Sequence, residues 1–362
     1  MVYQEFADFK FQNMNQYIPV AHVNPSYISI TRDLAFKDNK SYFFREDNRA
    51  DRIKNSKRMA QGFLSVNAKR KMQKAIEYLL YLSAEKRIYN RSSKKFLKFK
   101  VAFVTLTLSS EQKHSDNVIR KKLLHQLLIE LKQNYNVENY VWKAEKQVNG
   151  NIHFHIVLDR FIPHQQLRSR WNRIQNKLGY INAYQSKHGG KSNPNSVDIH
   201  SLYNIKNIGS YLSKYMSKNV EYQDNMNPAE LQKLIVKGKL WGSNHELSNI
   251  KGASIPVDSF VEKELQMLTA SEKVKTYVTD YFTVIYINVN QLFKLGSSLL
   301  YSTFLDYIND NFTQQTATYQ LIIQGDIYGV PKDEFMTSMS QKINELIQSG
   351  SISAGNFTGA TS

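Results

Sequence analysis

The order of the segments between residues 96 and 202 limits the folds that this chain can adopt. Apolar, β-branched segments of strand length alternate there with longer segments whose apolar residues recur every three or four positions. The resulting order is strand, helix, strand, strand, helix, strand, expected at residues 96–110, 115–135, 139–147, 152–159, 163–179 and 197–202. This order predicts an α+β domain of the ferredoxin-like or RRM-like type, an antiparallel sheet with helices on one face. The other face is then free for a ligand.

The domain limits follow from changes in composition along the chain. Residues 1–60 are expected to form a basic, mixed N-terminal extension, and residues 61–250 the α+β domain, beginning with a helix at 63–86. The segment 240–248 is predicted to be a last strand or an extended tail. Residues 256–362 are expected to be a small, mainly α-helical C-terminal domain with a disordered, Gly/Ser/Thr-rich tail from Ser349.

The charge of the chain is uneven and favours a polyanionic partner. The formal net charge is +17, but residues 251–362 hold 7 Lys/Arg and 11 Asp/Glu, so residues 1–250 carry +21. Such a field attracts nucleic acid first and anionic membranes second. No segment of about 18 apolar residues is present, so no membrane partner is expected. The sequence contains no cysteine, which excludes thiolate metal sites and fits a cytoplasmic location.

The strand expected at residues 152–159, with the sequence IHFHIVLD, carries two imidazoles on one face. Side chains alternate along a strand, so His153 and His155 point away from the face on which Phe154, Ile156 and Leu158 are buried. Two imidazoles at this spacing are able to hold one divalent cation if a third ligand is added.

Glu145, on the preceding strand, is the expected third ligand, and the hairpin register decides its position. A two-residue turn at Asn149-Gly150 pairs Lys146 with His153 and points Glu145 into the core. A three-residue turn over 149–151 pairs Gln147 with His153 and Glu145 with His155. A buried, unpaired carboxylate costs several kcal/mol, which favours the second register, with Gln147 as an alternative ligand. Such a ligand set leaves open coordination positions and suits Mg²⁺ or Mn²⁺ acting on a phosphate.

A second candidate site lies on the helix expected at residues 204–219, which contains YLSKYMSK. Tyr211 and Tyr215 are four residues apart and therefore share one helical face, with Lys214 and Lys218 repeating at the same interval beside them. Leu212 and Met216 lie on another side and are expected to be buried. Nearby cations favour the phenolate form of a tyrosine, which makes it a better nucleophile.

The two motifs together resemble those of the HUH endonucleases, specifically rolling-circle replication initiators of the two-tyrosine group found in small single-stranded-DNA bacteriophages. FVTLTL at residues 103–108 is similar to the first family motif, and HFH, with Glu145 eight residues upstream, to the second. Tyr-x-x-Lys-Tyr-x-x-Lys, from Tyr211 to Lys218, matches the third without a gap. The resemblance covers about residues 60–250, and LWGSNHELS at 240–248 is a weaker part of it.

The resemblance implies a nick at a specific single-stranded DNA origin. It implies a metal ion, Mg²⁺ or Mn²⁺, on His153, His155 and Glu145, attack by a tyrosine to give a 5′-phosphotyrosine, and rejoining through the other tyrosine. Lys214 and Lys218 are then expected to contact phosphate or phenolate. The free 3′ hydroxyl implies a DNA polymerase as partner in a bacterial host.

Three further expectations concern partners and alternatives. Arg168, Arg170 and Arg173 lie close together on one helix and are expected to contact DNA phosphates. HGGKS at 188–192 lacks the earlier glycine of a phosphate-binding loop, so a helicase of the host is the expected partner. The alternatives are a relaxase or transposase of a mobile element, or a non-catalytic protein that binds single-stranded nucleic acid.

Overall fold

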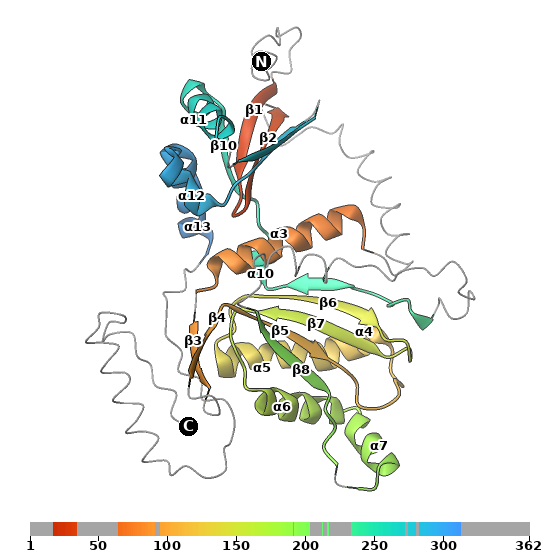
Figure 1. Ribbon diagram of the computed structural model, residues 1–362. Coiled ribbons are helices and arrows are strands. Elements are labelled where there is room, and N and C mark those ends of the chain that lie inside the picture. Colours follow the sequence, from red (N-terminus) through yellow and green to blue (C-terminus); the bar gives the residue numbers. More distant parts are fainter. Residues whose placement is uncertain are drawn as a thin grey trace. The chain divides into compact units, whose positions relative to one another are not determined.

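The computed structural model divides the chain into two compact units, each with its own antiparallel five-stranded sheet (Figure 1). The first unit combines Met1–Lys54 with Asn249–Gln314, and the second consists of Asn55–Ser248 with Gln315–Ser362. The structure describes residues 17–34, 64–84, 86–90, 95–190, 192–202, 212, 216, 233–271, 274–279 and 282–312. The candidate nucleophile segment, with Tyr211, Lys214, Tyr215 and Lys218, lies outside these residues, as does the tail from Ser349.

The second unit contains a sheet with the strand order β8-β5-β7-β6-β9, in which every neighbouring pair is antiparallel. Its strands are β5 (Val101–Leu106), β6 (Tyr140–Lys146), β7 (Ile152–Leu158), β8 (Val197–Leu202) and β9 (Trp241–Ser243). Its helices are α3 (Val66–Leu82), α4 (Asp116–Ile119), η1 (Arg120–Leu124), α5 (His125–Tyr135), α6 (His164–Asn176), α7 (Tyr180–Lys187) and α10 (His245–Ser248). A separate ribbon pairs β3 (Lys86–Asn90) with β4 (Lys95–Phe99).

The element order from β5 to β8 agrees with the order read from the sequence, and the differences are local. The segment expected as one strand at 96–110 is divided between β4 and β5. The helix expected at 115–135 begins at the Ser115 cap and contains one π-helical turn, η1. Helix α7 was not expected; it follows Gly179, whose φ of 80° ends α6 as predicted and starts a new helix. The segment at 240–248 forms β9 and α10.

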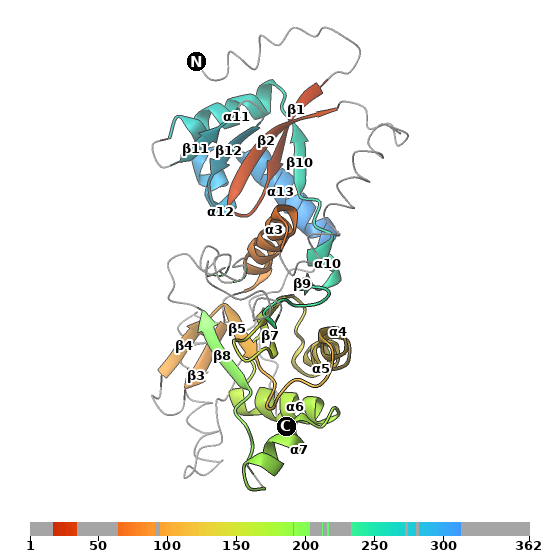
Figure 2. The same ribbon diagram turned by 90° about the vertical axis from the view of Figure 1, so that its right-hand side faces the viewer.

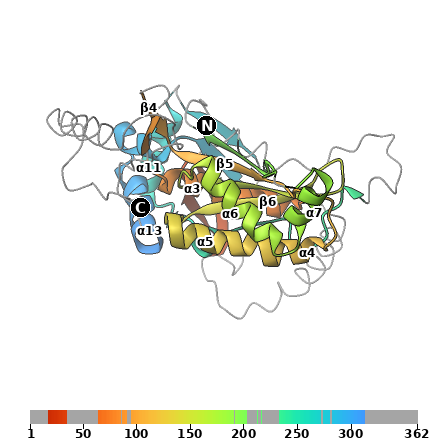
Figure 3. The same ribbon diagram turned by 90° about the horizontal axis from the view of Figure 1, so that it is seen from below.

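Helices α5 and α6 cover one face of this sheet, as seen from below in Figure 3. Phe154 and Ile156 of β7 point toward them and are fully buried. Trp171 of α6 is also fully buried, and its indole nitrogen donates to the Thr107 carbonyl oxygen over 2.8 Å. Burying a side chain of this size contributes a few kcal/mol, so this layer is the core that fixes the strands of the candidate site.

Helix α3 lies on the opposite side of the sheet from α5 and α6, where the sequence was expected to leave the face free (Figures 1 and 2). It packs against β6 and β9 through an apolar stripe that includes the buried Met72, Ile76 and Leu79. Val141 and Val157, which pair across β6 and β7 on this face, are fully buried. The open part of the face is therefore limited to the other end of β6 and β7.

The hairpin between β6 and β7 has a register that differs from both registers considered from the sequence. Glu145 pairs with His153, two positions away from the expected pairing with His155. The loop consists of residues 148–150, because the amide of Gly150 donates to the Gln147 carbonyl oxygen and Gly150 takes a φ of 83°. This loop is the three-residue type in which a turn ends in a left-handed residue, a position that glycine occupies without strain.

A buried ion pair holds the end of the same hairpin in place. The Lys146 ammonium lies 2.7 Å from the Asp116 carboxylate and also donates to the Gly150 carbonyl oxygen over 2.9 Å. Both side chains are less than 10 % exposed. The second oxygen of Asp116 accepts the backbone amide of Lys237 over 2.8 Å. The start of α4, the hairpin and the segment before β9 are thereby tied together.

The first unit has a sheet with the order β10-β1-β2-β12-β11, so both its early and its late segments supply strands. Its elements are β1 (Tyr17–Val23), β2 (Tyr27–Leu34), β10 (Ala253–Pro256), α11 (Ser259–Thr269), β11 (Lys275–Val278), β12 (Phe282–Tyr286), α12 (Val289–Leu292), η2 (Phe293–Leu295) and α13 (Ser298–Asn311). The change of domain near residue 250 agrees with the sequence reading. The described part after it differs from the mainly helical domain expected, because it contributes three strands to a sheet built on β1 and β2.

None of the helices in the described ranges combines the length and the apolar character that crossing a bilayer requires.

Candidate metal centre

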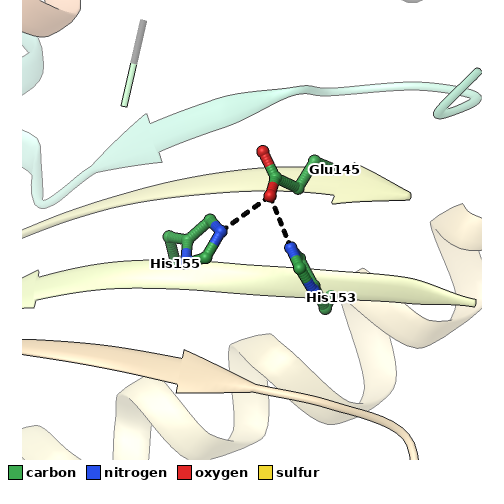
Figure 4. Close-up of side chains that lie close together, drawn as sticks. All are labelled: Glu145, His153 and His155. Carbon is green, nitrogen blue, oxygen red and sulfur yellow. Dashed lines mark hydrogen bonds and ion pairs between the residues drawn. The ribbon is translucent and has the colours of Figure 1, made fainter. Parts of the chain in front are cut away.

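Glu145, His153 and His155 meet on the open part of the β6–β7 face (Figure 4). The Oε1 atom of Glu145 lies 2.6 Å from Nε2 of His153 and 2.8 Å from Nε2 of His155. The three side chains are 31 %, 13 % and 16 % exposed, so they are shielded from bulk water but accessible from one side. The predicted placement of Glu145 beside both histidines is confirmed, although through a different register.

The strand geometry explains why these three side chains converge. Glu145 and His153 are directly opposite each other, and His155 follows His153 by two residues on the same face. The rings of the two histidines lie with centroids 4.6 Å apart and nearly perpendicular. Each ring therefore directs its Nε2 atom to the same carboxylate oxygen.

Lys143 completes the charge balance of the triad. It pairs with His155 on the same face, and its ammonium lies 3.0 Å from the second oxygen of Glu145. Burial alone would raise the pKa of Glu145, but hydrogen bonds from His153 and His155 and the charge of Lys143 hold that pKa well below its usual range. The carboxylate is therefore ionised at every physiological pH, as a ligand to a cation has to be.

The donor set fits a divalent cation. The three ligand atoms lie within 4.8 Å of one another, and two imidazole nitrogens with one carboxylate oxygen form a set used for Mn²⁺, Fe²⁺ and Zn²⁺. Three protein ligands leave coordination positions for water or substrate, as in catalytic rather than closed structural sites.

Four more side chains lie on the same sheet face as the triad. Thr105 pairs with His155 on one side and Asp198 on the other, and its hydroxyl lies 3.1 Å from Nδ1 of His155. Phe103 stacks on the His155 ring with centroids 5.3 Å apart. His200, which the sequence placed near the site, accompanies Asp198 on β8 at 2.7 Å, and both are more than 60 % exposed. Strand alternation alone places Thr105 and Phe103 on one face, but only the β5–β7 register shows that they contact His155.

The arginines expected to contact DNA lie on α6, on the helical side of the sheet. Arg170 and Arg173 both form ion pairs with Glu130 of α5, at 3.0 and 2.5 Å. Arg170 also lies over the ring of Tyr135, with its guanidinium carbon 5.2 Å from the ring centroid. These two arginines thus have a structural role between α5 and α6, and contact with DNA by Arg168, Arg170 and Arg173 stays a prediction.

The Glu130 cluster gives a pH-dependent contribution to stability. Burial raises the pKa of Glu130, but hydrogen bonds from Arg173, Gln126 and Arg170 outweigh it and lower the pKa to about 2. Because the folded-state pKa is depressed, the stabilisation is complete above the unfolded pKa of about 4.3 and is lost as the pH falls toward 2. We expect Glu130→Gln to lower the free energy of unfolding by about 1–2 kcal/mol at pH 7, allowing for solvent screening of the arginines.

At pH 3 the same substitution is expected to cost less than half of that, measured by urea unfolding at both pH values. Glu111→Gln, at an exposed position, is the control and should change stability little at either pH. An equal cost of Glu130→Gln at pH 7 and pH 3 would contradict the ionic origin of the stabilisation.

Comparison with known proteins agrees with this site. The family model for replication-associated proteins of the ORF2 type matches residues 101–220. The match supports a rolling-circle replication-associated protein. It includes β5 to β8, the complete triad and the segment with Tyr211 and Tyr215. It covers about a third of the chain. No curated protein and no solved structure matched.

Proposed function

We propose that the chain is a rolling-circle replication initiator of the HUH type that nicks and rejoins single-stranded DNA at an origin through two tyrosines. The observation that carries this proposal is the convergence of Glu145, His153 and His155 on the open part of a sheet face. The strand order β8-β5-β7-β6, with the element order strand, helix, strand, strand, helix, strand, supports the ferredoxin-like arrangement expected of such a domain.

The position of the tyrosine motif relative to the triad comes from the sequence and the family match. Leu212 and Met216 are helical and fully buried, in agreement with the prediction for that side of the helix. Tyr211 and Tyr215 each precede one of these residues, and both fall within the matched range that also contains the triad. A single domain therefore carries candidate metal ligands and candidate nucleophiles in the order expected for this class.

A divalent ion held by His153, His155 and Glu145, Mg²⁺ or Mn²⁺ in this proposal, would polarise the scissile phosphate as a Lewis acid. The phenol oxygen of one tyrosine attacks the phosphorus and forms a phosphotyrosine bond, while the bond from phosphorus to the 3′ oxygen breaks. The phenol proton passes to the leaving 3′ oxygen. Lys214 and Lys218 are assigned to stabilise the phenolate and the phosphate charge that develop. The second tyrosine later cuts the regenerated origin, and the first 5′ phosphate is rejoined to a 3′ hydroxyl.

The proposal also defines the partners. The released 3′ hydroxyl primes a DNA polymerase, and a host helicase separates the strands. The excess of +21 in residues 1–250 favours binding of the phosphate backbone.

The test is a covalent-adduct assay on circular single-stranded DNA and on an origin library, with the full chain and Mn²⁺. We expect an adduct that resists SDS, with protein on the 5′ phosphate and a new 3′ hydroxyl that a polymerase extends. EDTA should abolish the adduct. DNA retention without any adduct, at every metal concentration, would favour the non-catalytic binder. A match of the mapped tyrosine to neither position 211 nor position 215 would exclude the two-tyrosine assignment.

A further inference from the structure

The two histidines of the triad are supported differently on their far sides. Nδ1 of His155 lies 3.1 Å from the Thr105 hydroxyl, on the neighbouring strand β5. Nδ1 of His153 is buried and has no hydrogen-bond partner among the described residues. Both rings direct Nε2 to the same oxygen of Glu145. Only His155 is therefore held by polar contacts at both of its nitrogens.

The ring of His155 is also fixed in its plane. Phe103, two residues before Thr105, stacks on it with an angle of 17° between the rings. The stacking fixes the plane, but a half-turn about the Cβ–Cγ bond keeps the same plane and exchanges Nε2 with a carbon atom. The Thr105 hydroxyl is the contact that distinguishes the two orientations, because it bonds to Nδ1 only in the observed one.

A hydroxyl at this position suits both states of the ring. Without a metal, Nε2 carries the proton that it donates to Glu145, and Nδ1 accepts a hydrogen bond from the threonine. With a metal on Nε2, the proton is on Nδ1, which then donates. A threonine hydroxyl does either, since it is both donor and acceptor. Histidines that bind metals commonly use their second nitrogen in this way, and loss of the partner costs about 10–100-fold in metal affinity.

We propose that Thr105 is a positioning residue that fixes the His155 ring with Nε2 directed to the metal position beside Glu145. This inference deepens the proposed function and rests on it, because it requires the triad to hold a divalent ion. It also assigns a role to the threonine of the FVTLTL stretch, which the sequence alone left without one.

The experiment compares three variants of the full chain in Mn²⁺ binding, followed by electron paramagnetic resonance of the free ion. Thr105→Val keeps the shape and branching but removes the hydroxyl, and is expected to weaken Mn²⁺ binding about 10–100-fold. Thr105→Ser keeps the hydroxyl and should stay within about threefold of the wild type. Thr107→Val is the matched control, because Thr107 is similarly half-buried and its hydroxyl donates to a backbone oxygen, that of Ser196, over 3.2 Å.

A second measurement separates positioning from general damage to the strand. Nitrogen-15 spectra of the histidine rings with Zn²⁺, a diamagnetic probe, should show one His155 signal pattern in the wild type and Thr105→Ser. A second pattern from the turned ring should appear in Thr105→Val. Unfolding by urea should show similar losses of stability for Thr105→Val and Thr107→Val.

The outcomes are distinguishable. Unchanged Mn²⁺ affinity in Thr105→Val, or an equal loss in Thr107→Val, overturns the role of Thr105 and leaves the triad intact. Failure of Thr105→Ser to restore binding overturns it as well. If the wild type does not bind Mn²⁺, or binds it equally well after His153→Ala, the proposed function itself fails and the inference with it.

Discussion

His153→Ala and His155→Ala are each expected to lower the rate of DNA nicking by about 100–1,000-fold at a Mn²⁺ concentration that saturates the wild type. A metal acting as a Lewis acid supplies several kcal/mol of transition-state stabilisation, and 1.36 kcal/mol corresponds to a factor of ten in rate. Both imidazoles approach the same oxygen of Glu145, at 2.6 and 2.8 Å, so removing either leaves an incomplete ligand set. Single-turnover nicking and Mn²⁺ binding are to be measured on the same preparations.

The matched control is His200→Ala. His200 lies on the same sheet face, but it pairs with Asp198 and is not part of the triad. This variant should bind Mn²⁺ with wild-type affinity, since its ring is more than 60 % exposed and has no contact with Glu145 among those described. Nicking that persists at the wild-type rate in both triad variants would show that the metal centre lies elsewhere.

Replacing both Tyr211 and Tyr215 with phenylalanine is expected to abolish the covalent adduct, with a loss greater than about 1,000-fold. The phenol oxygen forms the new bond to phosphorus, and phenylalanine has no atom able to replace it. Each single variant should still form an adduct, because the other tyrosine is one helical turn away in the sequence pattern. The single variants should, however, fail to release a closed circle, which requires two successive transfers.

The readout for the tyrosines is the SDS-resistant adduct for the first cut and circular DNA for the second. Tyr184→Phe is a suitable control, since Tyr184 is a half-buried residue of α7 whose ring lies 4.3 Å from that of His188. It should behave as the wild type in both assays. An adduct formed at full yield by the double variant would disprove the assignment of this helix as the source of the nucleophile.

The sequence predicted the candidate site better than it predicted the hairpin that builds it. The alternation of His153, Phe154 and His155 determines which side chains share a face, whatever the register. Glu145 was expected opposite His155 and lies opposite His153. A shift of two residues keeps every side chain on its face, so the ligand set was right although the pairing was wrong. Asn149-Gly150 fits more than one loop type, and only the positive φ of Gly150 in the third loop position selects this one.

Contacts between distant segments account for what the sequence did not reveal. The short apolar runs at 275–278 and 282–286 were read as part of a helical region, because their partner strand β2 lies some 250 residues earlier. Short apolar runs do not distinguish a strand from a buried helical turn by periodicity alone. Helix α3 was expected as a helix, but the side of the sheet that it would cover depends on contacts with β6 and β9 that leave no local pattern.

The sheet of the first unit has a consequence for the birth of the chain on the ribosome. Its opening hairpin is completed by residues such as Ser254, whose hydroxyl bonds to His22 across 232 positions. At about 5–20 residues per second, translation separates these partners by some tens of seconds. A lone two-stranded ribbon is only marginally stable in water. The nuclease-type unit therefore emerges and has time to fold first, while β1 and β2 wait as an unfinished edge for strands that are made later.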